Sequence, residues 1–181
     1  MRKYWILIFV VVLLLVVFSC TQKTPAVEKG EAIFGEFTAA DMEGNPVTQE
    51  IFQDHDLTMV NIWATFCGPC ISEMPDLAQL QGEFGDDFQI IGIVVDATDG
   101  NGTPLPGKKA EAESIVDATG ADYLHLLPSK SLLQNYLHNV QSVPETIFVD
   151  ENGCQVGERY LGARNKQQWT KIISALLESV E

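Results

Sequence analysis

Residues 57–75, LTMVNIWATFCGPCISEMP, carry the pattern that decides the fold. The apolar run Leu57–Trp63 predicts a buried strand of a central sheet. Cys67 and Cys70 follow with two residues between them, and we expect a helix to open at Cys67. The unpaired N–H groups and positive dipole end of such a helix favour the thiolate form of the first cysteine, which is the nucleophile in disulfide exchange. A strand, a Cys-x-x-Cys pair and a helix therefore predict a two-electron dithiol/disulfide switch.

Other interpretations of the Cys-x-x-Cys pair fit the chain less well. A structural zinc site needs a second pair of Cys or His ligands, and His55, His125 and His138 form no such pair, so we predict no metal. A purely structural bridge gains little from closing so short a loop. A peroxidatic cysteine would follow a Pro-x-x-x-Thr-x-x-Cys pattern, but Val60 and Ala64 stand at the Pro and Thr positions.

The segment WATFCGPC, residues 63–70, resembles the active site of thioredoxins. The wider pattern is similar to one branch, the TlpA/ResA-type membrane-anchored thioredoxin-like reductases. That branch has an Asn in the strand before the motif, here Asn61. It also has a Glu three residues after the second cysteine and then a Pro, here Glu73 and Pro75. Asn61 cannot titrate, so we interpret it as a hydrogen-bonding core residue.

The resemblance continues downstream, where residues 142–153, SVPETIFVDENG, are similar to the family's cis-proline strand and hairpin turn. In all, it covers roughly residues 34–180. Two positions depart from the pattern. Phe66 replaces the commoner Trp before the first cysteine. Glu145 follows Pro144 where Thr is usual, at the edge expected to contact substrate, and this leaves the choice of partner open.

The expected fold is α/β: a thioredoxin-like three-layer sandwich in which helices flank a central mixed sheet, with extra strands near the N-terminus. The order of apolar runs and turn residues agrees with it. We expect strands near residues 34–39, 46–48, 57–63, 89–95, 123–127, 146–149 and 155–161, and helices near residues 69–84, 109–119, 129–137 and 166–180. The long loop at residues 96–108 should border the active site, where it could influence partner choice or merely connect two elements.

The resemblance implies roles for the residues of the motif. Cys67 would be the exposed attacking thiolate that forms a mixed disulfide, and the half-buried Cys70 would resolve it. Glu73 lies one helical turn from Cys70 and could act as the base that deprotonates it, as the family's buried Glu implies. A solvated helix glutamate is the alternative. Cys154 is interpreted as a packed or semi-exposed thiol, with a regulatory or intermolecular disulfide as the alternative.

Three residues are expected to contact the substrate. In the family, a cis bond between Val143 and Pro144 leaves the preceding backbone available to an extended substrate, and an ordinary trans proline is the alternative. Phe66 would be an exposed apolar lip, whereas Trp63 would belong to the core. Protein disulfides are the expected substrates, with apocytochrome c and thiol-recycled enzymes such as methionine sulfoxide reductase among the candidates. No cofactor is expected.

The direction of electron flow is less constrained by the motif. The dipeptide Gly68-Pro69 resembles that of reducing thioredoxins, so the leading hypothesis is a disulfide reductase that draws electrons from a membrane thiol carrier. The alternatives are a dithiol oxidase that installs disulfides and a non-catalytic binding module that retains the fold.

The N-terminal residues have the pattern of a targeting segment. Residues 1–19 carry two basic residues and a thirteen-residue apolar run, which is short for a membrane span and suits a lipoprotein signal peptide. Cys20 would be the lipidated residue, residues 20–30 a tether, and residues 31–181 the thioredoxin-like domain. The alternative is an uncleaved anchor at residues 4–19. Either reading places the domain on the extracytoplasmic side of the cell membrane.

Composition limits the partners further. The chain has 181 residues, of which 46% are hydrophobic, enough to build one substantial core. It has 25 acidic and 11 basic residues, a formal net charge of −14. Phosphate binding needs a basic face, so nucleic acid is not expected as a partner. We expect a monomer.

Overall fold

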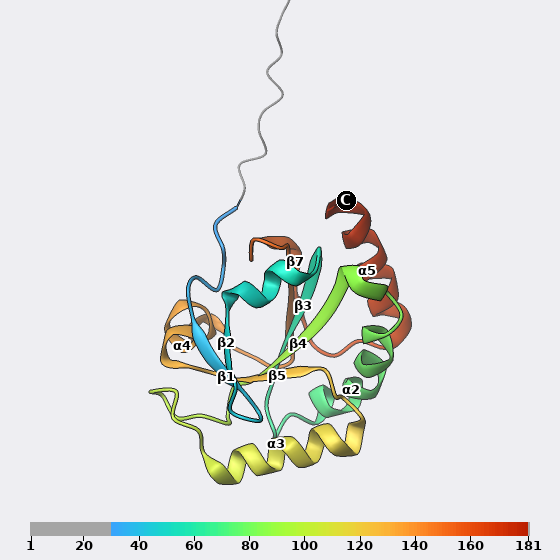
Figure 1. Cartoon of the computed structure of the whole chain (residues 1–181). Helices are drawn as coiled ribbons and strands as arrows, with labels where there is room; N and C mark the ends of the chain where they lie inside the picture. Colours follow the sequence, from blue (N-terminus) through green and yellow to red (C-terminus); the bar gives the residue numbers. More distant parts are fainter. Residues whose placement is uncertain (1–29, 181) are drawn as a thin grey trace, which may run out of the picture.

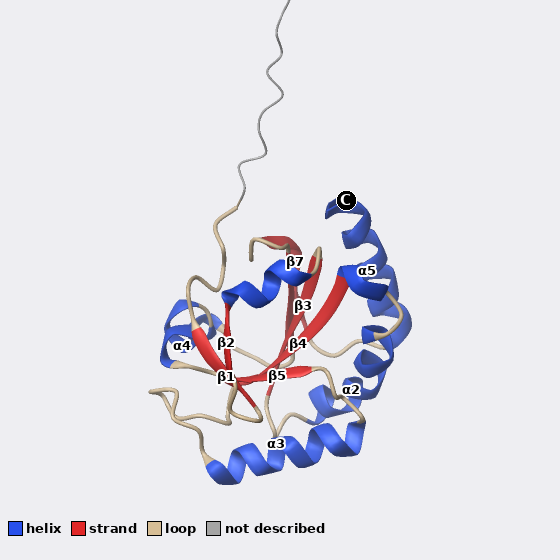
Figure 2. Cartoon of the chain, in the orientation of Figure 1, coloured by secondary structure: helices blue, strands red, loops and turns tan. Residues whose placement is uncertain are grey.

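The computed structural model describes residues 30–180, in which seven strands form one mixed sheet between two layers of helices (Figures 1 and 2). The strand order is β2-β1-β5-β4-β3-β6-β7. The strands are β1 (Thr38–Asp41), β2 (Pro46–Thr48), β3 (Leu57–Trp63), β4 (Phe88–Val94), β5 (Leu124–Leu127), β6 (Glu145–Val149) and β7 (Gln155–Leu161). This is the thioredoxin-like sandwich that the sequence predicts.

Helices cover both faces of the sheet. The α-helices are α2 (Gly68–Gln81), α3 (Pro106–Thr119), α4 (Lys130–Asn135) and α5 (Lys166–Val180), and the short 3-10 helices are η1 (Gln49–Asp54), η2 (Gly85–Asp87) and η3 (Leu137–Asn139). The buried side chains of α2, α3 and α5 share one hydrophobic cluster, and those of α4, η1 and η3 share the other. No helix within residues 30–180 is long and apolar enough to cross a membrane.

Strand β3 lies at the centre and leads directly to the cysteine pair. It pairs in parallel with β4 and antiparallel with β6, and all seven of its residues are buried. Its side chains alternate between the two clusters, Met59 on the side of α2 and Val60 on the side of α4. A strand that is buried on both faces explains the unbroken apolar run in the sequence.

Most predicted elements lie where the sequence places them, and the differences are at their ends. Helix α2 ends at Gln81, three residues before the predicted end, and helix α3 begins at Pro106, three residues before the predicted start. The first strand begins at Thr38 rather than at Phe34, because Gly35 has a φ of 56°, which breaks an extended run. Phe34 is instead buried in the cluster below α4. Helix α4 ends at Asn135, two residues before the predicted end, and the 3-10 helix η3 follows.

The N-terminal segment joins the domain at the β6–β7 hairpin. The Ile33 N–H donates to the Gly153 carbonyl (3.0 Å), and the Cys154 thiol donates to the Gly30 carbonyl (2.7 Å). Cys154 is thus a packed thiol, as expected. The hairpin lies at the end of the sheet where β3 begins, whereas Cys67 follows the other end of β3, so the chain enters the domain far from the cysteines (Figure 1). The signal peptide, Cys20 and nearly all of the tether lie outside the described residues.

Candidate active site

The cysteine pair forms the first turn of α2. Cys67 is the N-cap residue, and its sulfur accepts a hydrogen bond from the backbone N–H of Cys70 (3.2 Å). Pro69 occupies the first turn, where its missing N–H costs no helical hydrogen bond. The structure contains a disulfide between Cys67 and Cys70. When this bond is reduced, the helix N-terminus and the Cys70 N–H favour a thiolate at Cys67.

Both cysteines are more buried than the sequence analysis expected. Cys67 is 6% exposed rather than an open thiol, and Cys70 is 0% exposed rather than half-buried. Both belong to the hydrophobic cluster between α2 and the sheet, because the helix packs its first turn against β3. Cys67 is nevertheless the more exposed of the two, as predicted, because Cys70 has no exposed surface.

Glu73 lies one turn further along α2, and its carboxyl group is buried and accepts hydrogen bonds at both oxygens. It is 3% exposed, which excludes the alternative of a solvated helix residue. Its Oε1 accepts from the Asn61 side-chain amide (3.1 Å). Its Oε2 accepts from the backbone N–H of Arg164 (3.0 Å) and from the indole N–H of Trp169 (3.3 Å). Burial raises the pKa of Glu73, and the three hydrogen bonds offset part of that rise.

Asn61 and Trp63 are core residues of β3, as expected. Asn61 is 0% exposed and donates also to the Thr146 hydroxyl (3.1 Å). The indole N–H of Trp63 donates to Nδ1 of His125 (3.2 Å), whose Nε2–H donates to the Ala121 carbonyl (2.8 Å). Burial lowers the pKa of His125 to about 4, so this imidazole is neutral at pH 7 and supports packing rather than proton transfer.

The Val143–Pro144 peptide bond is cis, which excludes the alternative of an ordinary trans proline. Strand β6 pairs with β3 from Glu145, opposite Ile62, and so brings Val143 to the end of β3 that leads to Cys67. Val143 is half-buried and Ser142 is exposed. No residue within 30–180 makes a hydrogen bond to the backbone N–H or carbonyl of Val143. These two groups can therefore pair with an incoming chain.

An apolar groove of about 450 Å³ lies beside the cysteine pair. Phe66 forms one side of it and is 72% exposed, a large fraction for an aromatic side chain. The groove is lined by Phe66, Val95, Leu133, Leu137, Val140, Gln141, Ser142 and Val143. Because these residues come from the turn before α2, the end of β4, the α4–η3 segment and the loop before β6, only the folded chain assembles the groove.

The loop at residues 96–108 borders the site, as predicted from the sheet topology. Residues at both ends of the loop form hydrogen bonds with Thr65, which lies two residues before Cys67. Asp96 accepts hydrogen bonds from the Thr65 N–H (3.0 Å) and hydroxyl (2.6 Å), and the Lys108 ammonium donates to the same hydroxyl (2.8 Å). This arrangement holds the segment that leads into α2 against the end of β4.

Glu145 is not at an accessible edge, contrary to the expectation from its position after Pro144. It is 1% exposed, accepts a hydrogen bond from the Tyr136 hydroxyl (2.9 Å) and lies 3.5 Å from Nε of Arg159. Side chains alternate along β6, so Thr146 faces Asn61 and Glu73, whereas Glu145 faces the other cluster. The sequence contains no signal for these contacts, because Tyr136 and Arg159 belong to other elements.

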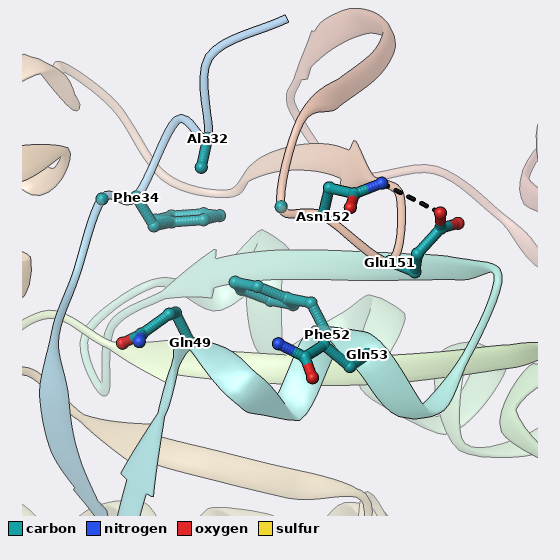
Figure 3. Close-up of a pocket in the computed structure, with 9 residues that line it drawn as sticks. Ala32, Phe34, Gln49, Phe52, Gln53, Glu151 and Asn152 are labelled. Carbon is teal, nitrogen blue, oxygen red and sulfur yellow. Dashed lines mark hydrogen bonds between the residues drawn. The ribbon is translucent and has the colours of Figure 1, made fainter. Parts of the chain in front are cut away.

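A second pocket, of about 430 Å³, is formed by the segment before β1, by η1 and by the β6–β7 turn (Figure 3). The β6–β7 turn lies at the end of the sheet away from the cysteine pair. The stacked rings of Phe34 and Phe52, 5.7 Å apart, form its apolar part. Glu151 and Asn152 of the β6–β7 turn lie across from them and are joined by a hydrogen bond (2.9 Å). No cysteine is among the residues that line this pocket.

Comparisons with known proteins agree with this geometry. The profile of the Redoxin family matches residues 21–174. The thioredoxin-like protein YneN of Bacillus subtilis is 27% identical over 110 residues, which cover 61% of this chain and 59% of YneN. The thiol:disulfide interchange protein DsbE of Haemophilus influenzae is 27% identical over 138 residues, which cover 76% of this chain and 68% of DsbE. The chain thus spans about three fifths to two thirds of the length of these relatives.

Solved structures share the fold at lower sequence identity. A thioredoxin-family thiol:disulfide interchange protein from Chlorobium tepidum superposes with a TM-score of 0.64 at 21% identity, covering 78% of this chain and 93% of that one. StoA from Bacillus subtilis superposes with a TM-score of 0.59 at 17% identity, covering 77% of this chain and 97% of StoA. At such identities the likeness concerns the fold alone.

Proposed function

Because the chain belongs to the Redoxin family, we propose that it is an extracytoplasmic thiol-disulfide oxidoreductase that reduces protein disulfides through Cys67 and Cys70. The observation that carries the proposal is the placement of the disulfide at the N-terminus of α2, next to an exposed apolar groove. The helix supplies the electrostatic field that a nucleophilic thiolate needs, and the groove gives a partner access to it.

The reaction has two exchange steps. In the reduced protein, the Cys67 thiolate attacks one sulfur of the partner disulfide, so that a mixed disulfide forms and one partner thiolate leaves. The Cys70 thiolate then attacks the Cys67 sulfur, which closes the Cys67–Cys70 bond and releases the second partner thiolate. Two electrons pass to the partner, and a membrane thiol carrier would return two electrons to the cysteine pair.

Glu73 would act in the second step. Cys70 is fully buried, and burial disfavours its thiolate form. Glu73 is buried on the same helix one turn away, and its raised pKa makes it a better proton acceptor than an ordinary glutamate. We assign to it the removal of the Cys70 proton when the mixed disulfide is resolved.

The groove would receive an extended segment of the partner. The N–H and carbonyl of Val143, which have no partner in the described part of the chain, offer backbone hydrogen bonds beside the disulfide, as in strand addition. An apolar side chain next to the partner's cysteine would lie against Phe66. Substrates would therefore be unfolded or locally extended polypeptides with an accessible disulfide.

A measurement of the reduction potential of the Cys67–Cys70 pair tests the direction of electron flow. A value of roughly −270 mV supports a reductase, and a value of roughly −120 mV supports a dithiol oxidase instead. The Gly68-Pro69 dipeptide between the cysteines favours the first outcome. Absence of any disulfide exchange with insulin would leave the binding module as the remaining hypothesis.

Replacing Phe66 with alanine is expected to raise KM for a peptide disulfide by about tenfold with little change in kcat. The loss of apolar contact with the partner weakens binding by about 1.4 kcal/mol, within the range for a partly buried aromatic side chain. Steady-state kinetics with a peptide disulfide and with a small acyclic disulfide such as 2-hydroxyethyl disulfide provide the measurement. Ile51→Ala is the control, because Ile51 is a half-buried apolar residue of η1, which packs against the β6–β7 hairpin at the end of the sheet away from the cysteine pair. Equal effects of the two substitutions would contradict a role of the groove.

We also propose that a lipid on Cys20 anchors the protein. Gly30 lies ten positions after Cys20, a reach of at most about 35 Å. Because the chain enters the domain at the hairpin end of the sheet, this anchor would leave the Cys67 end facing away from the membrane surface. The tether is long enough to hold the domain above the lipid head groups.

Wild-type protein is expected to incorporate labelled palmitate and to sediment with membranes, and Cys20→Ala should lose the label. The reason is that thioether attachment needs the Cys20 sulfur. Metabolic labelling followed by fractionation is the measurement, and Cys154→Ala is the control that should keep the label. A wild-type protein that takes up no lipid but stays in the membrane with its full N-terminus would identify residues 4–19 as an uncleaved anchor.

A further inference from the structure

The hydrogen bonds of the Asn61 side-chain amide are unevenly divided between its nitrogen and its oxygen. It lies in the middle of β3 and is 0% exposed. Its Nδ2 donates twice, to Oε1 of Glu73 and to the hydroxyl of Thr146, both at 3.1 Å. Its Oδ1 is buried and has no hydrogen-bond partner within residues 30–180. Buried polar atoms are nearly always paired, so the unpaired acceptor beside a buried carboxyl group needs an explanation.

The two oxygens of Glu73 differ in what surrounds them. Oε2 accepts from the Arg164 backbone N–H and the Trp169 indole N–H, which can only donate. These donors suit Oε2 both in a carboxylate and as the carbonyl oxygen of a neutral acid. Oε1 has a single partner, the Asn61 amide. A carboxylate Oε1 needs a donor there, but a protonated Oε1 needs an acceptor.

An asparagine amide can meet both needs, because a half-turn about its Cβ–Cγ bond exchanges Nδ2 and Oδ1. With the nitrogen toward Glu73, the amide donates to the carboxylate. With the oxygen toward Glu73, it accepts from the carboxylic O–H. The Thr146 hydroxyl tolerates the exchange, since it can either accept or donate. The unpaired Oδ1 is the acceptor that the protonated state requires.

We propose that Asn61 is a positioning residue that lets Glu73 take up and release a proton, by turning its amide between a donor and an acceptor orientation. The inference rests on the role of Glu73 proposed above. During resolution, Cys70 gives its proton to Glu73, the protonated Oε1 donates to Asn61 Oδ1, and the Cys70 thiolate attacks the Cys67 sulfur. When the pair is next reduced, the Cys70 thiolate recovers the proton and the amide turns back.

No other titratable group described around Glu73 takes the place of the Asn61 amide as the hydrogen-bond partner of Oε1. The Arg164 guanidinium stacks over the rings of Tyr160 and Trp169, and its charge favours the carboxylate. The Tyr123 hydroxyl is buried and has no hydrogen-bond partner within residues 30–180, and burial raises its pKa, so it stays neutral. On α2, Cys67 and Cys70 form the redox pair, and Asp76 accepts a hydrogen bond from the Lys166 N–H (2.8 Å). On α5, Lys166 bonds to Gln79 and Glu83, and Lys171 and Glu178 are exposed. On α3, Lys108 and Lys109 pair with Glu111 and Glu113, and Asp117 is exposed.

Nuclear magnetic resonance of the wild-type protein tests the amide directly. As the pH falls through the titration of Glu73, the Asn61 Nδ2 resonances should shift and lose their contacts with Thr146. They should adopt the same position in Glu73→Gln, because the glutamine carbonyl must serve Arg164 and Trp169 and its NH₂ then faces Asn61. The Asn135 amide, which donates to the Phe34 carbonyl (2.9 Å), is the internal control and should not respond. An Asn61 amide that keeps its position in both experiments overturns the proposal.

The pH dependence of partner release gives a second readout. Asn61→Val removes both orientations, and the carboxylate loses more than the neutral acid because charge-assisted hydrogen bonds are about twice as strong. The midpoint of the release profile should therefore rise by about one pH unit. Thr146→Val, which leaves the Asn61–Glu73 hydrogen bond in place, should keep the wild-type midpoint.

A double-mutant comparison separates this inference from the proposed function. In the Glu73→Gln background, Asn61→Val should not move the midpoint further, because the titrating group is absent. An unchanged profile in Asn61→Val, together with an altered profile in Glu73→Gln, would contradict the role of Asn61 alone. An unchanged profile in Glu73→Gln would contradict the role of Glu73 and, with it, that of Asn61.

Discussion

Replacing Cys70 with serine is expected to accumulate covalent mixed disulfides between Cys67 and partner proteins, whereas Cys67→Ser should accumulate none. A serine hydroxyl cannot displace a partner from the Cys67 sulfur, so the first exchange step proceeds and the second stops. The burial of the two residues supports this division of roles, since Cys70 is 0% exposed and cannot meet a partner first. Non-reducing electrophoresis of affinity-purified protein, followed by mass spectrometry, measures the trapped species.

Cys154→Ser is the matched control for this experiment, because the Cys154 thiol hydrogen-bonds to Gly30 at the far end of the sheet. It should behave like the wild type and trap no more partner. Adducts in Cys67→Ser but not in Cys70→Ser would reverse the assignment of attacking and resolving cysteines. The identities of the trapped proteins would also name the substrates.

Replacing Glu73 with glutamine is expected to slow the release of a trapped partner by about 100-fold near neutral pH, with a smaller effect on the first attack. Loss of a positioned general base costs a factor of this order, and only release needs Cys70 as a thiolate. Stopped-flow measurement of mixed-disulfide formation and decay separates the two steps. The comparison should use the macroscopic pH profile of release, because ionisable groups that interact give apparent pKa values that belong to the pair.

The same substitution should change how stability depends on pH. The pKa of Glu73 is raised in the folded protein, so its contribution to stability is present at low pH and is lost as the pH rises through the folded pKa. Glu73→Gln lacks this loss, and its stability relative to the wild type should increase with pH. Thermal unfolding across the pH range provides the measurement. A wild-type profile of both release and unfolding would contradict the role proposed for Glu73.

Much of the fold follows from short-range sequence patterns. The apolar run of β3 covers the same residues in the sequence prediction and in the structure, Leu57–Trp63, because burial on both faces removes any need for polar positions. The sequence likewise predicts a helix over residues 166–180, the bounds of α5, and Trp169 and Ile173 are its buried residues. Signals of this kind depend on neighbours within a few residues, so no tertiary information is needed to detect them.

The contacts of the active site instead join residues that are far apart in the sequence. Glu73 receives hydrogen bonds from Arg164 and Trp169, which lie 91 and 96 residues further along the chain. Asn61 reaches Thr146 across 85 residues, through the pairing of β3 with β6. No local pattern encodes such pairs, because strand register and the docking of α5 on α2 decide which side chains meet.

The sequence by itself determined the order of the elements, the position of the cysteine pair and the helix that starts on it, because each of these depends on residues close together in the chain. Only the tertiary structure decided how deeply Cys67 lies, that Glu145 turns away from the disulfide, and that four separate segments form the groove at Phe66. Burial depends on the layers packed above and below a residue, and those layers come from parts of the chain that meet only when it folds.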